Sequence, residues 1–469
     1  MLFSSMIFLW VFLPIVLILY YAVPGDRIKN IVLLAASLVF YAWGEPVYIL
    51  LMLLVVGINY VFGMILSVRK EKWILALGVA ANLAVLGYYK YFDFGVSILN
   101  RIAGRDIAAY RSIGLPLGIS FFTFQALSYM VDVYRGDNAA QKNYFRLLLY
   151  VSLFPQLVAG PIVKYHDVEQ QLAGRTYSWE KEAEGVRRFI YGLAKKVLLS
   201  NTLALYADSM FNADLHAFSS GALWVAALLY TFQIYFDFSG YSDMAIGLGK
   251  LFGFDFKENF RYPYVSGSVR EFWRRWHISL STWFKEYVYI PLGGNRKGSW
   301  RTYRNLLIVF FTTGLWHGAS TNFIVWGLYH GFFLILERAF LGKWLDRSKA
   351  GNIVGHVYTA VVVILGWVIF RIEGGMHNVL FCLRKMLSFS GGQYALTDVV
   401  GPKVAVLLLL AFLLSGPLQS VCKRKVQSWQ KTSPAAVFRT ETVLLFCLLF
   451  LCFMMLVSDT YNPFIYFRF

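Results

Sequence analysis

The sequence predicts an all-α integral membrane protein that crosses the bilayer many times. Hydrophobic residues make up 58% of the 469 residues and charged residues only 15%, whereas soluble domains carry about 25% charged residues. A soluble globule of this size could not cover its surface with so few charges, and so apolar a chain excludes disorder. Apolar stretches also recur at the length of about 20 residues that a membrane helix needs.

The apolar stretches are separated by short polar breaks. Several are short or interrupted by Gly and Pro, as at Pro116 and Gly118, and at Pro155 and Gly160. Irregular backbone is tolerated in a membrane only where protein or a water cavity satisfies it, so we expect re-entrant or short helices there and about 11 true crossings. The stretches are 6–22, 30–44, 47–66, 73–92, 114–133, 145–163, 186–206, 221–240, 304–316, 321–341, 353–370, 403–420 and 441–458.

The net charge of +18 is concentrated in two parts of the chain. Residues 257–304 hold ten Lys and Arg against three acids, and residues 423–439 hold five with no acid. Basic loops lie on the cytoplasmic side of membrane proteins, so the second stretch predicts a cytoplasmic loop. We attribute the excess to such loops and to anionic lipid, with no role for nucleic acid. The first positive charge, Arg27, follows the apolar start, which favours a first membrane helix over a cleaved signal.

The segment Tyr235–Gly249 places two carboxylates in apolar surroundings. A lone carboxylate in hydrocarbon is unfavourable by a few kcal/mol, so each needs a partner, a cavity or water. A cap or an ion pair with the Arg-rich stretch that follows is the structural interpretation, and a place at a functional cavity is the functional one. The candidates in this segment are Asp237, Ser239, Tyr241 and Asp243.

The segment Ser268–Glu286 combines basic and aromatic residues. If it is one helix, Arg270, Arg274 and His277 share a face. Interleaved tryptophans are typical of a membrane-surface helix, whereas a basic, aromatic mouth could hold an anionic donor. The sequence leaves both interpretations open. The candidates from this segment are Arg270, Trp273, Arg274, Trp276 and His277.

The segment Thr312–Gly331 contains His317 and His330 in apolar surroundings. Each is either a buried neutral histidine or a general base, because an unperturbed imidazole titrates near neutral pH. We predict no metal site: the two histidines are 13 positions apart, no HExxH motif occurs, and the four cysteines form no close pair. Trp316 and Asn322 are further candidates for the same site.

With these residues in view, the chain resembles the membrane-bound O-acyltransferase family, and most of all its bacterial branch that serves alginate O-acetylation. The teichoic-acid D-alanylation branch shares the last two blocks more loosely. The resemblance rests on Met1-Leu-Phe-Ser-Ser5, Gly118-Ile-Ser-Phe-Phe-Thr-Phe-Gln125, Phe154-Pro-Gln-Leu-Val-Ala-Gly-Pro161, Tyr235–Gly249, Glu271-Phe-Trp-Arg-Arg-Trp-His-Ile-Ser-Leu-Ser-Thr-Trp283 and Gly314-Leu-Trp-His-Gly318.

The resemblance implies a single domain over 1–469, a ring of helices around a central through-membrane tunnel. N-terminal helices would occupy 1–110, the catalytic core 114–342 and C-terminal helices 353–469. By resemblance, His317 is the invariant histidine of the family and His277 is the second functional histidine. His330 would shape the wall of the tunnel. A cytoplasmic acyl thioester, acetyl-CoA, would be the donor, with no permanently bound cofactor. A periplasmic or extracellular acetyltransferase partner and a polysaccharide would be the acceptors, at a bacterial inner membrane.

Three alternatives stay open from the sequence. The same chemistry could serve D-alanyl transfer to teichoic acid or peptidoglycan O-acetylation. A transporter or lipid-linked glycan flippase would also place polar residues at mid-membrane, although the sequence has no inverted repeat and few acids for ion coupling. A non-catalytic scaffold of a polysaccharide-secretion complex is the third alternative.

Overall fold

In the computed structural model, residues 1–347, 349–458 and 461–465 are described, and they fold into helices joined by turns. Within these residues there is no strand, and Phe218 and Tyr394 form one isolated bridge. The chain divides into two compact units, residues 1–189 with 242–257, and residues 190–241 with 258–469. The division runs through two helices rather than at the segment borders expected from the sequence, and the single-domain organisation stays a prediction.

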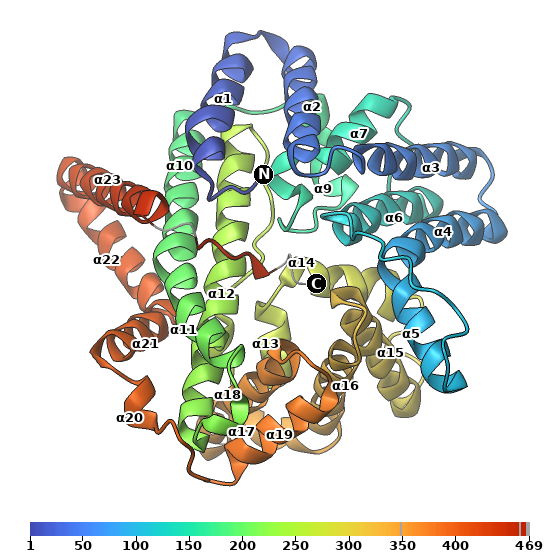
Figure 1. Ribbon diagram of the computed structural model, residues 1–469. Coiled ribbons are helices and arrows are strands. Elements are labelled where there is room, and N and C mark those ends of the chain that lie inside the picture. Colours follow the sequence, from blue (N-terminus) through green and yellow to red (C-terminus); the bar gives the residue numbers. More distant parts are fainter. Residues whose placement is uncertain (348, 459–460, 466–469) are drawn as a thin grey trace. The chain divides into compact units, whose positions relative to one another are not determined.

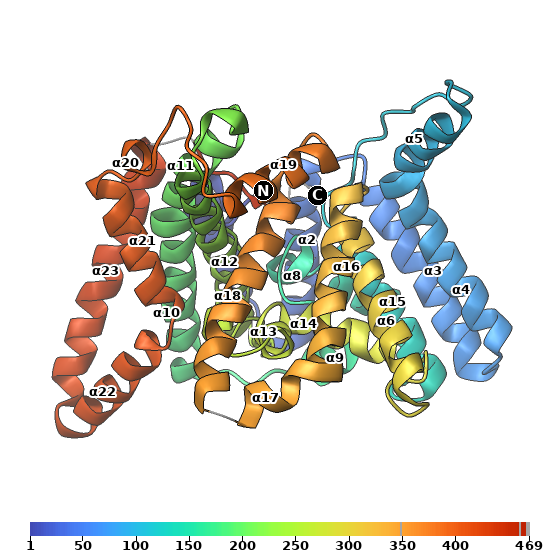
Figure 2. The same cartoon turned by 90° about the horizontal axis from the view of Figure 1, so that it is seen from below.

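The first unit begins with a π-helical turn and contains most of the N-terminal helices (Figure 1). In both views α3, α4 and α6 lie side by side (Figures 1 and 2). The apolar stretch 145–163 is broken, as its Gly and Pro residues predict, into two short helices and extended chain. The helices are α1 Leu13–Ala22, α2 Gly25–Gly44, α3 Ile49–Val68, α4 Lys72–Leu86, α5 Phe92–Ala103, α6 Ile119–Arg135, α7 Tyr144–Ser152, α8 Phe154–Leu157, α9 Tyr165–Ala173 and most of α10 Trp179–Ala194.

The second unit contains most of the central helix α12, Ser220–Leu251, and the helices after it. The stretch 423–439, predicted as a basic loop, is helical and belongs to α22 and the start of α23. The other helices are α11 Asn201–Phe211, α13 Val269–Arg275, α14 Ile278–Phe284, α15 Ser299–His317, α16 Thr321–Leu336, α17 Gly342–Arg347, α18 Lys349–Arg371, α19 Met376–Leu387, α20 Leu396–Val399, α21 Pro402–Ser415, α22 Leu418–Thr432 and α23 Pro434–Ser458.

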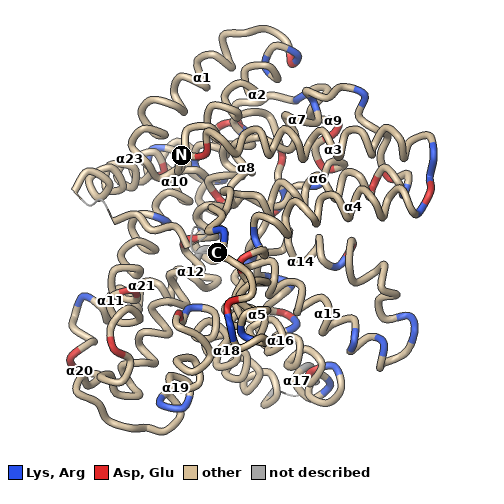
Figure 3. The backbone as a smooth tube through the Cα atoms, turned by 45° about the vertical axis from the view of Figure 1, so that its right-hand side comes forward, with Lys and Arg blue, Asp and Glu red and all other residues tan. Residues whose placement is uncertain are grey.

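Seven helices among the described residues are long and apolar enough to cross a membrane. They are Gly25–Gly44, Ile49–Val68, Lys72–Ala103, Ser220–Leu251, Thr321–Leu345, Ala350–Arg371 and Pro434–Ser458. Phe8–Ala22 and Pro402–Ser415 are shorter apolar helices, and the expected number of about 11 crossings stays a prediction. Lys and Arg gather where helices end, for example between α3 and α4 and before α15 (Figure 3).

Glycines allow two close helix approaches that position side chains of the second unit. A Cβ at Gly240 of α12 would lie 2.8 Å from the carbonyl oxygen of Gly192 in α10. Where α15 crosses α16, a Cβ at Gly314 would lie 2.3 Å from the oxygen of Phe323, and one at Gly327 would lie 2.1 Å from that of Phe310. Small residues let helix backbones meet in this way in membrane proteins.

Candidate active site

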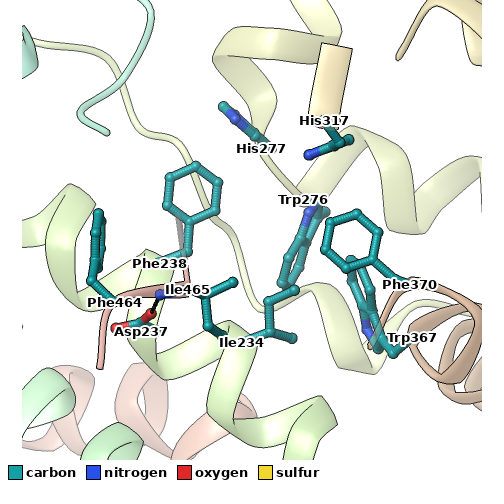
Figure 4. A pocket seen from close by; sticks show the side chains of 10 residues that line it. All are labelled: Ile234, Asp237, Phe238, Trp276, His277, His317, Trp367, Phe370, Phe464 and Ile465. Atoms are coloured by element: carbon teal, nitrogen blue, oxygen red, sulfur yellow. Dashed lines mark hydrogen bonds between the residues drawn. The ribbon is translucent and has the colours of Figure 1, made fainter. Parts of the chain in front are cut away.

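A small apolar pocket lies within the second unit, and both candidate histidines line it. Figure 4 shows the two imidazoles on the same side of the pocket, with Asp237 and Ile465 farther away. Side chains from α12, the α13–α14 junction, the end of α15, α18 and the segment 464–465 meet here. The lining residues are Ile234, Asp237, Phe238, Trp276, His277, His317, Trp367, Phe370, Phe464 and Ile465.

His277 enters the pocket because the helix breaks in front of it. Helix α13 ends at Arg275, and His277 precedes α14 in the left-handed conformation, with φ of 43°. The expectation that Arg270, Arg274 and His277 share one helix face is therefore wrong, since the chain turns between Arg275 and His277. A left-handed conformation is unfavourable for a residue with a Cβ, and such strain is common at functional sites.

The hydrogen bonds of His277 determine which ring nitrogen carries the proton. Its Nδ1 lies 3.3 Å from Oδ1 of Asn259, and the backbone N–H of Ser279 donates to the same oxygen at 3.1 Å. Since that oxygen is an acceptor, Nδ1 must be the donor, which leaves the lone pair on Nε2. Nε2 is buried and accepts no hydrogen bond from any described residue.

The crossing of α15 and α16 positions His317. This histidine is the last residue of α15, and Gly318 continues in extended conformation toward Ser320, which caps α16. The imidazole is half-buried. The rings of Trp326 and Phe370 meet it edge-on, at centroid distances of 5.0 and 5.1 Å. The close helix crossing thus presents the imidazole to the pocket from a rigid support.

The two carboxylates predicted from the sequence both form ion pairs. Oδ1 of Asp237 lies 2.6 Å from Nζ of Lys196, and both side chains are 2% exposed. In the first unit, Arg188 donates from Nε and Nη2 to Oδ1 of Asp243 at 3.0 and 2.8 Å. An ion pair was one of the expected outcomes, but the expected source is wrong. The basic partners precede α12, because α10 and the π-helical turn after it pack along that helix.

The tryptophans of the second predicted segment are buried, so its interpretation as a membrane-surface helix is wrong. Trp273 is 8% exposed, Trp276 4% and Trp283 6%. Trp276 lines the pocket and packs on Trp367 at a centroid distance of 4.8 Å. Trp273 lies behind the pocket, 5.1 Å from the ring of His330.

The other candidate residues from the sequence do not line the pocket. Arg270 and Arg274 are exposed. Asn322 donates from Nδ2 to the carbonyl oxygen of Ile372 at 2.6 Å, a bond that ties α16 to the end of α18. The remaining candidates are buried and are Ser239, Tyr241, Trp316 and His330. Trp316 lies 6.0 Å from the ring of His277, between the two histidines in sequence and next to both in space.

Sequence reasoning missed Asn259, Lys196, Phe464 and Ile465. Lys196 carried a signal, because a lysine inside the apolar stretch 186–206 needs a partner of opposite charge. Asn259 lies in a polar stretch among many candidates, and nothing in the sequence connects it to His277. Phe464 and Ile465 are apolar residues near the end of an apolar chain, so their place in the pocket depends on tertiary structure alone.

Comparisons with known proteins identify the family of this chain. The chain matches the MBOAT, membrane-bound O-acyltransferase family over residues 138–372. It is 43% identical to a protein of Pseudomonas putida named probable alginate O-acetylase AlgI, over all of both chains. It is 45% identical to the protein of that name in Pseudomonas aeruginosa, over 88% of this chain and 81% of the other. It is also 35% identical to a peptidoglycan O-acetyltransferase of Helicobacter pylori, over 83% and 80%.

The matched region contains both pocket histidines and most of the pocket wall. The family and the apolar helices confirm the all-α, multi-pass membrane architecture predicted from the sequence. The identities to acetylases confirm an acyl-transferring enzyme. The chain belongs to the membrane-bound O-acyltransferase family, and it is an O-acyltransferase of the membrane.

Proposed function

We propose that the protein moves an acetyl group from a cytoplasmic thioester, acetyl-CoA, across the inner membrane for O-acetylation of an extracellular polysaccharide such as alginate. The observation that carries the proposal is that His277 and His317, far apart in sequence, line one small apolar pocket. The relatives named alginate O-acetylase support the choice of polymer, because one of them matches this chain over its whole length.

His317 is the general base in this proposal. Acyl transfer requires removal of a proton from the attacking hydroxyl while its oxygen bonds to the thioester carbonyl carbon. His317 accepts that proton, the carbon–sulfur bond breaks, and the thiolate of CoA leaves and takes up a proton. Proton transfer by a positioned side chain contributes about 10²–10⁴-fold to a rate.

His277 orients the acceptor. Its Nδ1 donates to Asn259, so Nε2 carries the lone pair, and the residue lines the apolar pocket. Nε2 therefore receives a hydrogen bond from a hydroxyl rather than donating one to the thioester oxygen. Orientation of the acceptor therefore fits the hydrogen bonds of His277, and polarisation of the thioester does not.

The donor approaches the basic stretch of residues 257–304. The stretch 257–304, with its excess of Lys and Arg, attracts the phosphates of CoA. Arg270 and Arg274 lie in this stretch and are exposed. The immediate acceptor is a partner acetyltransferase on the outer side, which passes the group to the polysaccharide. Direct transfer to a glycan is the alternative.

Peptidoglycan O-acetylation is the second candidate function, and the 35% identity to the Helicobacter pylori protein supports it. It uses the same pocket chemistry and differs only in the acceptor. D-alanyl transfer to teichoic acid receives less support, because relatives of that name are 29% identical and cover 56–57% of this chain. The acetyl content of the isolated exopolysaccharide and of the peptidoglycan, compared in one strain, separates these candidates.

The test of the base is His317→Ala in a strain that carries the variant as its only copy. We expect acetyl ester on the secreted polymer to fall by about 10²-fold or more, because the proton acceptor is lost. His377→Ala is the matched control, since His377 is exposed on α19 and does not line the pocket. Normal acetylation by a membrane-expressed His317→Ala protein would overturn the assignment. Thioester consumption by wild-type membranes separates an enzyme from a transporter or scaffold.

A further inference from the structure

Residues 461–465 follow helix α23 and are fixed inside the second unit at two buried ion pairs. At the first, Nη2 of Arg371 lies 2.6 Å from Oδ1 of Asp208, and the hydroxyl of Tyr461 donates to the other oxygen of Asp208. The arginine side chain is 3% exposed and the aspartate 7%. This cluster fixes the start of the segment.

The second ion pair is that of Lys196 and Asp237, at the pocket. The backbone N–H of Ile465 donates to Oδ2 of Asp237 at 2.9 Å, and Lys196 donates to the carbonyl oxygen of Pro463. Hydrogen bonds to ionised groups are about twice as strong as neutral ones. Removing one partner of a buried ion pair is strongly unfavourable because the other charge stays buried. The segment is therefore held firmly in its position.

The segment 461–465 forms an apolar wall of the pocket. Phe464 and Ile465 are 4% and 6% exposed, and both line the pocket with the histidines. The ring of Phe464 packs on Tyr241 of α12 at a centroid distance of 5.0 Å. Figure 4 shows Phe464 and Ile465 across the pocket from His277 and His317.

We propose that Phe464 and Ile465 limit the length of the acyl group that the enzyme transfers. The inference rests on the proposed function, because it takes the histidines as the place where the acyl carbonyl reacts. The acyl chain beyond that carbonyl then extends toward the opposite wall. The cavity volume of about 20 Å³ leaves room for one water-sized group, such as the methyl of an acetyl.

Longer chains are excluded because the wall cannot retreat. Each additional methylene would have to displace Ile465 or Phe464. The backbone N–H of Ile465 is tied to Asp237, and the carbonyl of Pro463, next to Phe464, is tied to Lys196. A packed site that gains a methylene forces side chains out of their rotamers. Discrimination between acyl chains that differ by one methylene in an apolar pocket is typically about 10–200-fold. The ion pair of Lys196 and Asp237 thus holds Phe464 and Ile465 in position.

The test compares acyl donors of different length in wild type and in Ile465→Ala. Inside-out membrane vesicles, prepared from strains with one variant each, keep the partner proteins and expose the cytoplasmic side. Release of free CoA is measured with acetyl-CoA, propionyl-CoA and butyryl-CoA, and vesicles of His317→Ala provide the background. We expect the butyryl-to-acetyl ratio of kcat/KM to rise by about tenfold or more in Ile465→Ala.

Two further variants make the result decisive. Val457→Ala shortens an exposed side chain on α23 and should leave the ratio unchanged. Ile465→Val removes a single methyl group, so it should raise the propionyl-to-acetyl ratio of kcat/KM several-fold. This variant tests the proposal if the Ile465→Ala protein does not accumulate in the membrane. An unchanged ratio in a variant that still transfers acetyl would overturn the proposal. Failure of wild-type vesicles to consume any thioester would instead overturn the proposed function.

Discussion

His277 and His330 are equally buried, each 1% exposed, and each lies against a tryptophan ring of the second unit. Their polar contacts differ. His277 lines the pocket, and its Nδ1 lies at Asn259. His330 does not line the pocket, and neither of its ring nitrogens has a hydrogen-bond partner among the described residues. Its Nε2 lies against α18, where a Cβ at Gly366 would approach it to 2.6 Å.

The difference shows that burial alone does not separate two histidines whose hydrogen bonds differ. A ring whose orientation is set by a hydrogen bond has a defined tautomer and a lone pair at a known position. A ring held only by neighbouring aromatic groups fills space, and its nitrogens have no assigned task. The three predictions that follow test this contrast, and the expected effects decrease from one to the next.

The largest effect is expected for His277→Asn. Asparagine tolerates the left-handed conformation of this position, so the backbone is preserved while the imidazole is lost. Acyl transfer to the polymer should fall by about 10²-fold or more, because the acceptor hydroxyl loses its partner at Nε2. The measurement is acetyl ester per mass of polymer, with protein amount in the membrane as the control. Near-normal acetylation would mean that the imidazole of His277 only packs.

A smaller effect is expected for Asn259→Ala, which leaves both histidines in place. The hydrogen bond to Nδ1 contributes about 1 kcal/mol, and this corresponds to roughly a fivefold loss of rate. Because the bond orients a side chain that binds the acceptor, kcat should fall while KM for the thioester changes little. Asn259→Asp is the matched variant, since a carboxylate still accepts from Nδ1 and should recover activity. Equal loss in both variants would argue for a merely structural asparagine.

The sequence predicted the helical membrane fold and both pocket histidines, but it could not predict how they come together. His317 was recognisable from its Leu-Trp-His-Gly block, and its place depends on glycines that are local in sequence. His277 lay in an equally recognisable block. However, helical periodicity assigned it to the face of Arg270, because nothing in the periodicity marks the left-handed turn that interrupts the helix.

Long-range contacts account for most of what sequence reasoning missed. Asp237 was a candidate because a charge in an apolar stretch requires a partner, and the same argument applies to Lys196 without showing which acid it meets. The hydrogen bond from Ile465 to Asp237 joins residues 228 positions apart. Such a contact has no local signal, since any apolar residue has a backbone N–H. Apolar pocket walls are for this reason the part of a site that sequence patterns predict least well.

The smallest effect is expected for His330→Leu, the counterpart of the His277 substitution. An apolar side chain that replaces a buried ring without hydrogen bonds removes no favourable polar contact, and it relieves two nitrogens that are buried without partners. Acetylation should stay within about twofold of wild type, and the midpoint of thermal unfolding in detergent should stay the same or rise. A loss comparable to that of His277→Asn, in a protein that unfolds at the normal temperature, would place His330 in the chemistry. Orientation by a hydrogen bond would then not separate the two histidines.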